Sequence, residues 1–135
     1  MKSSLFAVIF LIPMLAAAVG GRQPVSPEAA AQLRKEAVAL RQQAAADPRN
    51  ADILVKLGFV YARLKRPDDA RRAFESAVAL DPARAEAHYM LGLIYEKKGM
   101  KDKALASWRA CLESAKEPGM RATAARHIHN LTAGK

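Results

Sequence analysis

Apolar residues between positions 51 and 118 recur with helical spacing, and the same pattern is written twice along the chain. The first copy predicts a helix over about 51–64, a polar turn, and a second helix that begins at Pro67. The second copy follows at a constant offset, which places Ala85 at the position of Ala51. A fixed period of 34 residues predicts stacked helix-turn-helix units that bury their apolar faces against one another.

The two copies are identical at six positions. These pairs are Ala51/Ala85, Leu57/Leu91, Gly58/Gly92, Tyr61/Tyr95, Asp68/Asp102 and Ala70/Ala104. The large ring of Phe74 in the first copy is matched by Trp108 in the second. The closing proline of the first copy, Pro82, has its counterpart two residues late at Pro118, which predicts a longer second helix or turn.

The segments on either side of the doubled pattern each predict one more helix. Ser26 and Pro27 form a start signal, because the Ser oxygen can accept a free backbone N–H and proline needs no donor there. The apolar face after this signal is Ala29, Leu33, Ala37, Leu40 and Ala44, and the face expected in the last helix is Ala122, Ala125, Ile128 and Leu131. Both helices are expected to cap the array.

This Leu-Gly, Tyr, Ala, Phe/Trp pattern resembles the tetratricopeptide repeat. The resemblance implies an all-α solenoid, with two helix-turn-helix repeats between an N-terminal and a C-terminal capping helix. The expected divisions are 1–20, signal peptide or N-terminal anchor; 21–50, linker and N-terminal capping helix; 51–84, repeat 1; 85–118, repeat 2; and 119–135, C-terminal capping helix and tail.

The segment 1–20 predicts export. Lys2 supplies a positive start, an apolar run covers Leu5 to Leu15, and small residues follow up to Gly21, so a signal peptidase could cut after Ala18 or Gly20. The mature chain would then be periplasmic or secreted. The alternative is an uncleaved anchor in the inner membrane, because positions 5–21 reach the lower limit of the roughly 17 to 25 residues that span a bilayer.

Charge and cysteine content narrow the classes of partner. The chain has 22 Lys and Arg residues against 13 Asp and Glu residues, a formal net charge of +9. Its basic residues are scattered without interleaved aromatics, which disfavours nucleic acid and favours acidic proteins or anionic lipid headgroups. The single cysteine, Cys111, excludes an internal disulfide and falls on a position expected to be buried.

No constellation of residues predicts catalysis. His127 and His129 lie two positions apart, so on a helix they point about 200° apart and cannot share a metal ion. The chain carries no Gly-rich phosphate loop and no cysteine cluster. We therefore expect no enzyme activity, no metal site and no cofactor.

The resemblance assigns ligand binding to the concave face, which in this family is formed mainly by the first helix of each repeat. The groove residues that it implies are Val55, Lys56, Phe59, Arg63, Tyr89, Met90, Leu93 and Lys97. The apolar members are expected to be exposed and to bind a peptide or an amphipathic helix, while the cations pair with acidic groups at the ends of the ligand. Some members of the family grip a C-terminal carboxylate with lysines and asparagines of the groove. In this chain the fifth and ninth positions of the first helices are Val55, Phe59, Tyr89 and Leu93, so the resemblance does not imply such a clamp.

These observations predict a protein-binding adaptor or assembly factor that acts outside the cytoplasm, similar to small exported repeat proteins of bacteria. Three alternatives stay open. The chain could be a membrane-tethered subunit of an envelope complex, it could self-associate as a homodimer, or a terminal helix could fill the groove.

Overall fold

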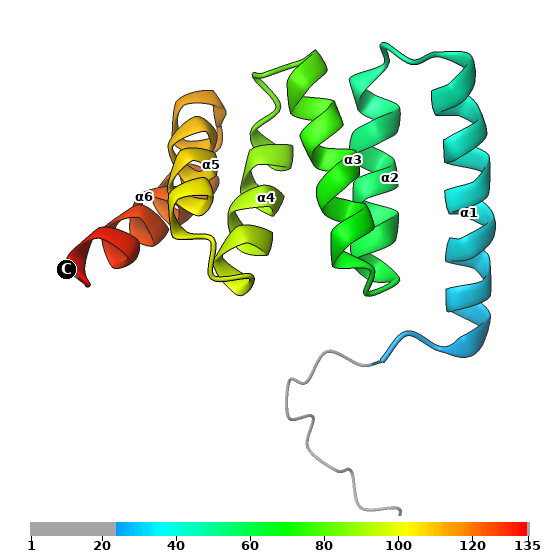
Figure 1. Cartoon of the computed structure of the whole chain (residues 1–135), viewed down its shortest axis with the longest axis horizontal. Coiled ribbons are helices and arrows are strands. Elements are labelled where there is room, and N and C mark those ends of the chain that lie inside the picture. Colours follow the sequence, from blue (N-terminus) through cyan, green and yellow to red (C-terminus); the bar gives the residue numbers. More distant parts are fainter. Residues whose placement is uncertain (1–23, 135) are drawn as a thin grey trace, which may run out of the picture.

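The computed structural model describes residues 24–134, which form a row of six helices without strands (Figure 1). The helices are α1 (Pro27–Ala46), α2 (Ala51–Arg63), α3 (Pro67–Leu80), α4 (Ala85–Lys97), α5 (Lys101–Ser114) and α6 (Pro118–Ala133). The main packing is between helices that follow one another in sequence, as in a solenoid. The proposed signal peptide or anchor at 1–20 lies outside the described residues. Within residues 24–134, no helix combines the length and the apolar character that a membrane span requires.

The two repeats match residue for residue. The bounds of α4 and α5 follow those of α2 and α3 at the same offset at both ends. In each repeat, the two helices pack together at a glycine of the first helix. A Cβ added to Gly58 would lie 2.6 Å from the Phe74 ring, and one added to Gly92 would lie 2.5 Å from the Trp108 ring. The missing side chain therefore lets the first helix of each repeat lie directly against the large ring of the second.

The buried core runs along the whole row of helices as one cluster. Phe74, Trp108 and Cys111 are its largest fully buried side chains. The burial of Cys111 that the sequence predicts is confirmed, and burial raises the pKa of its thiol. A short chain can form such a core because each helix buries only the stripe that faces its neighbours.

α1 covers the first repeat. Its start has the predicted form, since the Ser26 hydroxyl accepts a hydrogen bond from the Ala29 amide at 3.2 Å and Pro27 is the first helical residue. Leu33, Ala37 and Leu40 are buried and belong to the common core cluster. The rest of its surface is mostly polar or carries alanine, apart from the exposed Val38.

α6 packs on α5, with two differences from the sequence-based expectation. Ala122 and Ala125 are exposed and Ala124 is buried, because the inward face of the helix runs through Met120, Ala124, Ile128 and Leu131. The expected lengthening before Pro118 is also wrong. α5 ends at Ser114, the position equivalent to Leu80, and Pro118 is the first residue of α6, so the connection is one residue shorter than that between α3 and α4.

Candidate protein-binding face

Phe59 on α2 and Leu93 on α4 are the two most exposed of the predicted apolar site residues. They occupy the same position in successive repeats and leave 38% and 37% of their surface exposed. The Phe59 ring meets the Phe74 ring edge-on, with 5.2 Å between centroids. The inner part of Phe59 thus rests on the core, while its outer part is available to a ligand.

Tyr89 and Met90 lie on α4 near Leu93 in sequence and are partly buried against the core. Tyr89 packs edge-on against Trp108, with ring centroids 5.1 Å apart. Both side chains therefore have a structural role and present only part of their surface. We call Phe59, Leu93, Tyr89 and Met90, together with the cations Lys56, Arg63 and Lys97, the Phe59–Leu93 face.

Val55 does not belong to this face, and the expectation that it is exposed is wrong. Only 7% of its surface is accessible. It joins the buried cluster that also contains Leu33, Ala37 and Leu40 of α1. The packing of α1 on α2 thus extends the core over the start of the first repeat.

The charges that remain available on the face are all positive. Lys56, Arg63 and Lys97 are exposed and form no ion pair within residues 24–134. The carboxylate of Glu96, nearby on α4, lies 2.8 Å from Nδ1 of His127. A ligand that meets the face would therefore encounter cations without competing acidic partners.

Arg84 binds the acidic residues at the start of the two first helices. Its guanidinium lies 2.5 Å from Asp52 on α2, 2.7 Å from Asp81 in the connection, and 3.7 Å from Glu86 on α4. Hydrogen bonds to Asp81 and Asp52 raise the pKa of Arg84. This cluster, which the sequence pattern did not reveal, links α2 to α4 through one side chain.

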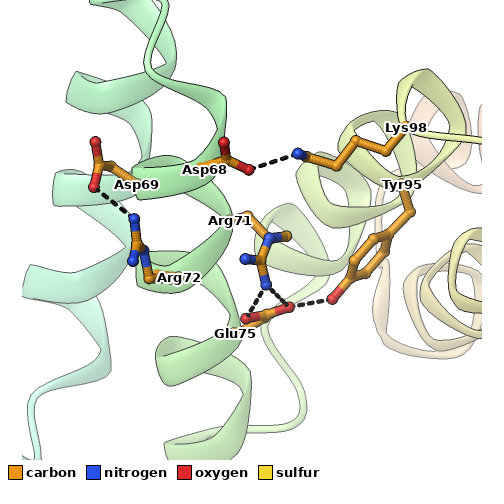
Figure 2. A network of polar contacts seen from close by, with 7 residues as sticks. All are labelled: Asp68, Asp69, Arg71, Arg72, Glu75, Tyr95 and Lys98. Atoms are coloured by element: carbon orange, nitrogen blue, oxygen red, sulfur yellow. Dashed lines mark hydrogen bonds and ion pairs between the residues drawn. The ribbon is translucent and has the colours of Figure 1, made fainter. Parts of the chain in front are cut away.

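A polar network holds α4 on α3 and so sets how the two repeats sit together (Figure 2). Arg71 donates to both carboxylate oxygens of Glu75 at 2.9 Å, and the Tyr95 hydroxyl donates to the same carboxylate. Lys98, which follows the last residue of α4, lies 2.5 Å from Asp68 in the first turn of α3. The contacts of Tyr95 and Lys98 reach from the second repeat to the first, so they fix the relation between the units that carry Phe59 and Leu93.

The network also shifts the pKa values of its members. Burial raises the pKa of Glu75, but hydrogen bonds from Tyr95 and Arg71 outweigh burial and hold that pKa below its usual 4.5. Burial together with the hydrogen bond to Glu75 raises the pKa of Tyr95 to about 12. The network is therefore at its strongest with an ionised Glu75 and a neutral Tyr95.

α6 covers the second repeat without closing over the face. His127 stacks on the buried Trp108, with ring centroids 4.2 Å apart and planes at 16°, and also contacts Glu96 of α4. Phe59 and Leu93 keep their exposure with α1 and α6 in place. Neither described terminal helix thus occupies the surface around these two residues.

The polar residues singled out from the sequence have packing roles. His88 lies 2.7 Å from the carbonyl oxygen of Pro82, and His127 contacts Trp108 and Glu96 as described above. Across residues 24–134, no three His, Cys, Asp or Glu side chains come together as a metal ion would require.

Comparison with known proteins places the repeat pattern in a family. The sequence model of the tetratricopeptide repeat matches residues 55–117, which covers most of both repeats. No curated protein is a significant match to the chain.

Several solved structures share the fold. The chain is similar to PcrH, solved in complex with the chaperone binding region of PopD, with a TM-score of 0.69, 16% identity, and coverage of 78% of this chain and 82% of the other. It is similar to TTC0263, a thermophilic TPR protein of Thermus thermophilus, with a TM-score of 0.63, 28% identity, and coverage of 75% of this chain and 52% of the other. It is also similar to the first TPR of Spaghetti (RPAP3), bound to the HSP90 peptide SRMEEVD, with a TM-score of 0.58, 18% identity, and coverage of 84% of this chain and 98% of the other.

Proposed function

Because the repeats of this chain match the tetratricopeptide repeat family, we propose that the chain is an adaptor that holds a segment of another protein against the Phe59–Leu93 face. Proteins of this family are generally non-catalytic modules for protein interaction. Two of the similar structures, PcrH and the first TPR of Spaghetti, were solved with peptide segments of other proteins. The proposal transfers this mode of binding, and not those partners, to the present chain.

One observation carries the proposal. Phe59 and Leu93 repeat an exposed apolar side chain at the same place on two successive first helices. The same helices carry Lys56, Arg63 and Lys97, which are exposed and form no ion pair among the described residues. Exposed apolar residues that recur in this way suit a ligand with apolar side chains on one side. Acidic residues at the ends of the ligand would meet Arg63 and Lys97, mainly speeding association.

The proposal includes action outside the cytoplasm. It rests on the sequence of residues 1–21, whose positive start, apolar run and small-residue tail are typical of a signal peptide. N-terminal sequencing of the protein made in its own host would test this part. A mature start at Val19 or Gly21 supports export with cleavage, whereas a retained Met1 or Lys2 in the membrane fraction supports the tethered subunit.

The binding face is tested with a double variant, Phe59→Glu with Leu93→Glu. Each carboxylate would have to be desolvated under a bound apolar ligand, so we expect the partner captured by the tagged wild-type chain to be lost. Capture from an envelope extract, followed by binding measurements with the purified partner, gives the readout. Circular dichroism checks that the variant keeps its helical content.

A matched control is Val38→Glu with Leu80→Glu, which adds the same charge at exposed apolar positions of α1 and α3. Capture that survives in the control and fails in the face variant supports the proposal. Equal capture by both variants would reject the Phe59–Leu93 face as the binding site. Light scattering of the wild type and the face variant would show a dimer that depends on the face, which is the self-association alternative.

A further inference from the structure

The alternating direction of the helices brings three separate segments to one edge of the array. The start of α1, the turn between α2 and α3, and the turn between α4 and α5 all lie at the lower side of Figure 1. We call these segments, residues 24–28, 63–69 and 97–103, the basic edge. The opposite edge is formed by the other three connections, residues 46–52, 80–86 and 113–121.

The two edges carry charge of opposite sign. The basic edge has seven Lys or Arg residues and four Asp or Glu residues. The opposite edge has four Lys or Arg residues and six Asp or Glu residues. All seven cations of the basic edge are exposed. Asp68 and Asp69 pair with Lys98 and Arg66 of this edge and with Arg72 of α3. The other five cations, Arg63, Lys65, Lys97, Lys101 and Lys103, form no ion pair within residues 24–134. Positive charge is therefore concentrated along one edge rather than spread evenly.

The backbone at Lys65 supports a role for this charge. Lys65 has a φ of 55°, in the left-handed region, and the equivalent residue of the second repeat is Gly99 with a φ of 71°. A residue with a Cβ is less favourable than glycine in this conformation, because the Cβ crowds the following carbonyl oxygen. The first turn thus carries a lysine at a position where the local backbone favours glycine.

The basic edge also exposes apolar side chains among its cations. Met100, between Lys97 and Lys101 in the second turn, leaves 38% of its surface exposed, and Val25, just before α1, leaves 37%. The chain enters α1 at this edge, after the apolar sequence of residues 5–21. Cations with interspersed apolar side chains suit the boundary between lipid headgroups and acyl chains.

We propose that the basic edge docks on an anionic lipid surface. The cations of the two turns contact headgroup phosphates, Met100 enters the boundary region, and the helices stand upright on the membrane. In this position the acidic opposite edge faces away from the bilayer, and the Phe59–Leu93 face stays open at the side. Arg63 and Lys97 belong both to the basic edge and to the Phe59–Leu93 face, whereas Lys65 and Lys101 belong to the edge alone. The proposal does not depend on partner binding.

Lysine footprinting tests the docked edge on the full chain without any substitution. Acetylation of each lysine is followed by mass spectrometry on vesicles of phosphatidylcholine alone and of phosphatidylcholine with phosphatidylglycerol. We expect the anionic vesicles to slow the acetylation of Lys65, Lys97 and Lys101 at least about threefold, and 0.5 M salt to abolish this protection. Lys35 on α1 and Lys116 on the opposite edge serve as internal controls and keep their rates.

A set of variants gives an independent readout. The edge variant combines Lys65→Gly, Lys97→Gln and Lys101→Gln; its first substitution relieves the left-handed backbone, so a loss of binding is not explained by unfolding. The control variant, Arg41→Gln with Arg49→Gln and Lys116→Gln, removes three cations elsewhere. Vesicle flotation measures how much binding increases when phosphatidylglycerol is added to phosphatidylcholine.

We expect this phosphatidylglycerol-dependent increase in binding to be at least about tenfold smaller in the edge variant than in the wild type, and the control variant to keep most of it. Comparing the increase, and not total binding, removes any contribution of residues 1–23 that is common to both vesicle types. Equal losses in both variants, or equal protection of Lys65 and Lys116, would overturn the proposal, because net charge and not the edge would then govern binding. No protection on anionic vesicles would overturn it as well, whatever the outcome for partner capture.

Discussion

The ring of Phe74 occupies the space beside Gly58 that any larger side chain would need. A methyl group at position 58 would meet three ring atoms at 2.6–2.8 Å, and that ring is itself fully buried. We expect Gly58→Ala to lower the free energy of unfolding by about 1–3 kcal/mol through overpacking. This loss exceeds the gain of up to about 1 kcal/mol from the helix propensity of alanine. Urea denaturation provides the measurement.

Gly119→Ala is the control for this prediction. Gly119 lies in α6, and no other group lies within 4 Å of the position that its Cβ would take. The substitution should leave stability unchanged or raise it slightly. If Gly58→Ala were as stable as Gly119→Ala, the close approach of α2 to Phe74 would not restrict the fold.

Acid should weaken the contact between α3 and α4 through Glu75. The folded pKa of Glu75 lies below its usual 4.5, so its stabilisation is complete above about pH 4.5 and is lost as the pH falls through the folded pKa. At pH 7 we expect the free energy of unfolding of the wild type to exceed that of Glu75→Gln by about 1 kcal/mol. The difference is modest because the pair of Arg71 and Glu75 is partly exposed. Urea denaturation at pH 7, 5 and 3 should show this difference shrinking toward acid. A difference that is constant with pH would contradict the assignment.

Alkali should weaken the same contact through Tyr95. Its pKa rises from 10.0 to about 12 in the folded chain, so its stabilisation is complete below pH 10 and is lost as the pH rises toward 12. Tyr95→Phe removes the hydroxyl and should abolish this alkaline dependence. Tyr61→Phe, at the equivalent position of the first repeat, is the control. The same alkaline loss in both variants would show that the hydrogen bond to Glu75 is not its source.

The stacking of His127 on Trp108 should fix α6 in place. His127→Ala removes a ring 4.2 Å from the indole and a contact with Glu96, and we expect a loss of about 1–2 kcal/mol. Trp108 is the only tryptophan, so its emission should shift to longer wavelength as water reaches it. His129→Ala, on the exposed side of the same helix, should change neither quantity. Unchanged emission in His127→Ala would mean that other residues cover the indole.

Val55 and Phe59 should respond differently to the same change. A glutamate at the buried position 55 would bring an unpaired charge into the core and should cost at least about 3 kcal/mol. A glutamate at position 59 can turn its carboxylate to solvent and should leave the array folded. Thermal unfolding followed by circular dichroism distinguishes the two. A folded Val55→Glu variant would return Val55 to the candidate binding face.

The sequence was sufficient to predict the helical repeats and the residues that pack inside each of them. The constant offset between the two copies predicts equivalent helices, because this feature depends on local spacing, and the bounds of α2 to α5 confirm it. The all-α solenoid is confirmed by the six helices and by the family match. The assignment of the binding residues themselves stays a prediction.

The errors came from packing between units that do not share the repeat. Val55 and Tyr89 are equivalent in sequence, yet Val55 is buried and Tyr89 is partly exposed, because α1 lacks the repeat pattern that would reveal how it covers α2. α6 likewise turns Ala124 inward in place of Ala125, on the face that also carries Met120, Ile128 and Leu131. Arg84 and His127 acquire their roles only when side chains from several helices meet.

Cys111 is the only cysteine of the chain and is completely buried, so the rate of its modification reports how often this part of the fold opens. A thiolate is the form that reacts with modifying reagents, and burial both raises the pKa of this thiol and keeps reagents away from it. Modification must therefore wait until α5 separates from its neighbours. The rate at which a thiol reagent labels Cys111 of the wild-type protein would measure the frequency of local unfolding in the second repeat.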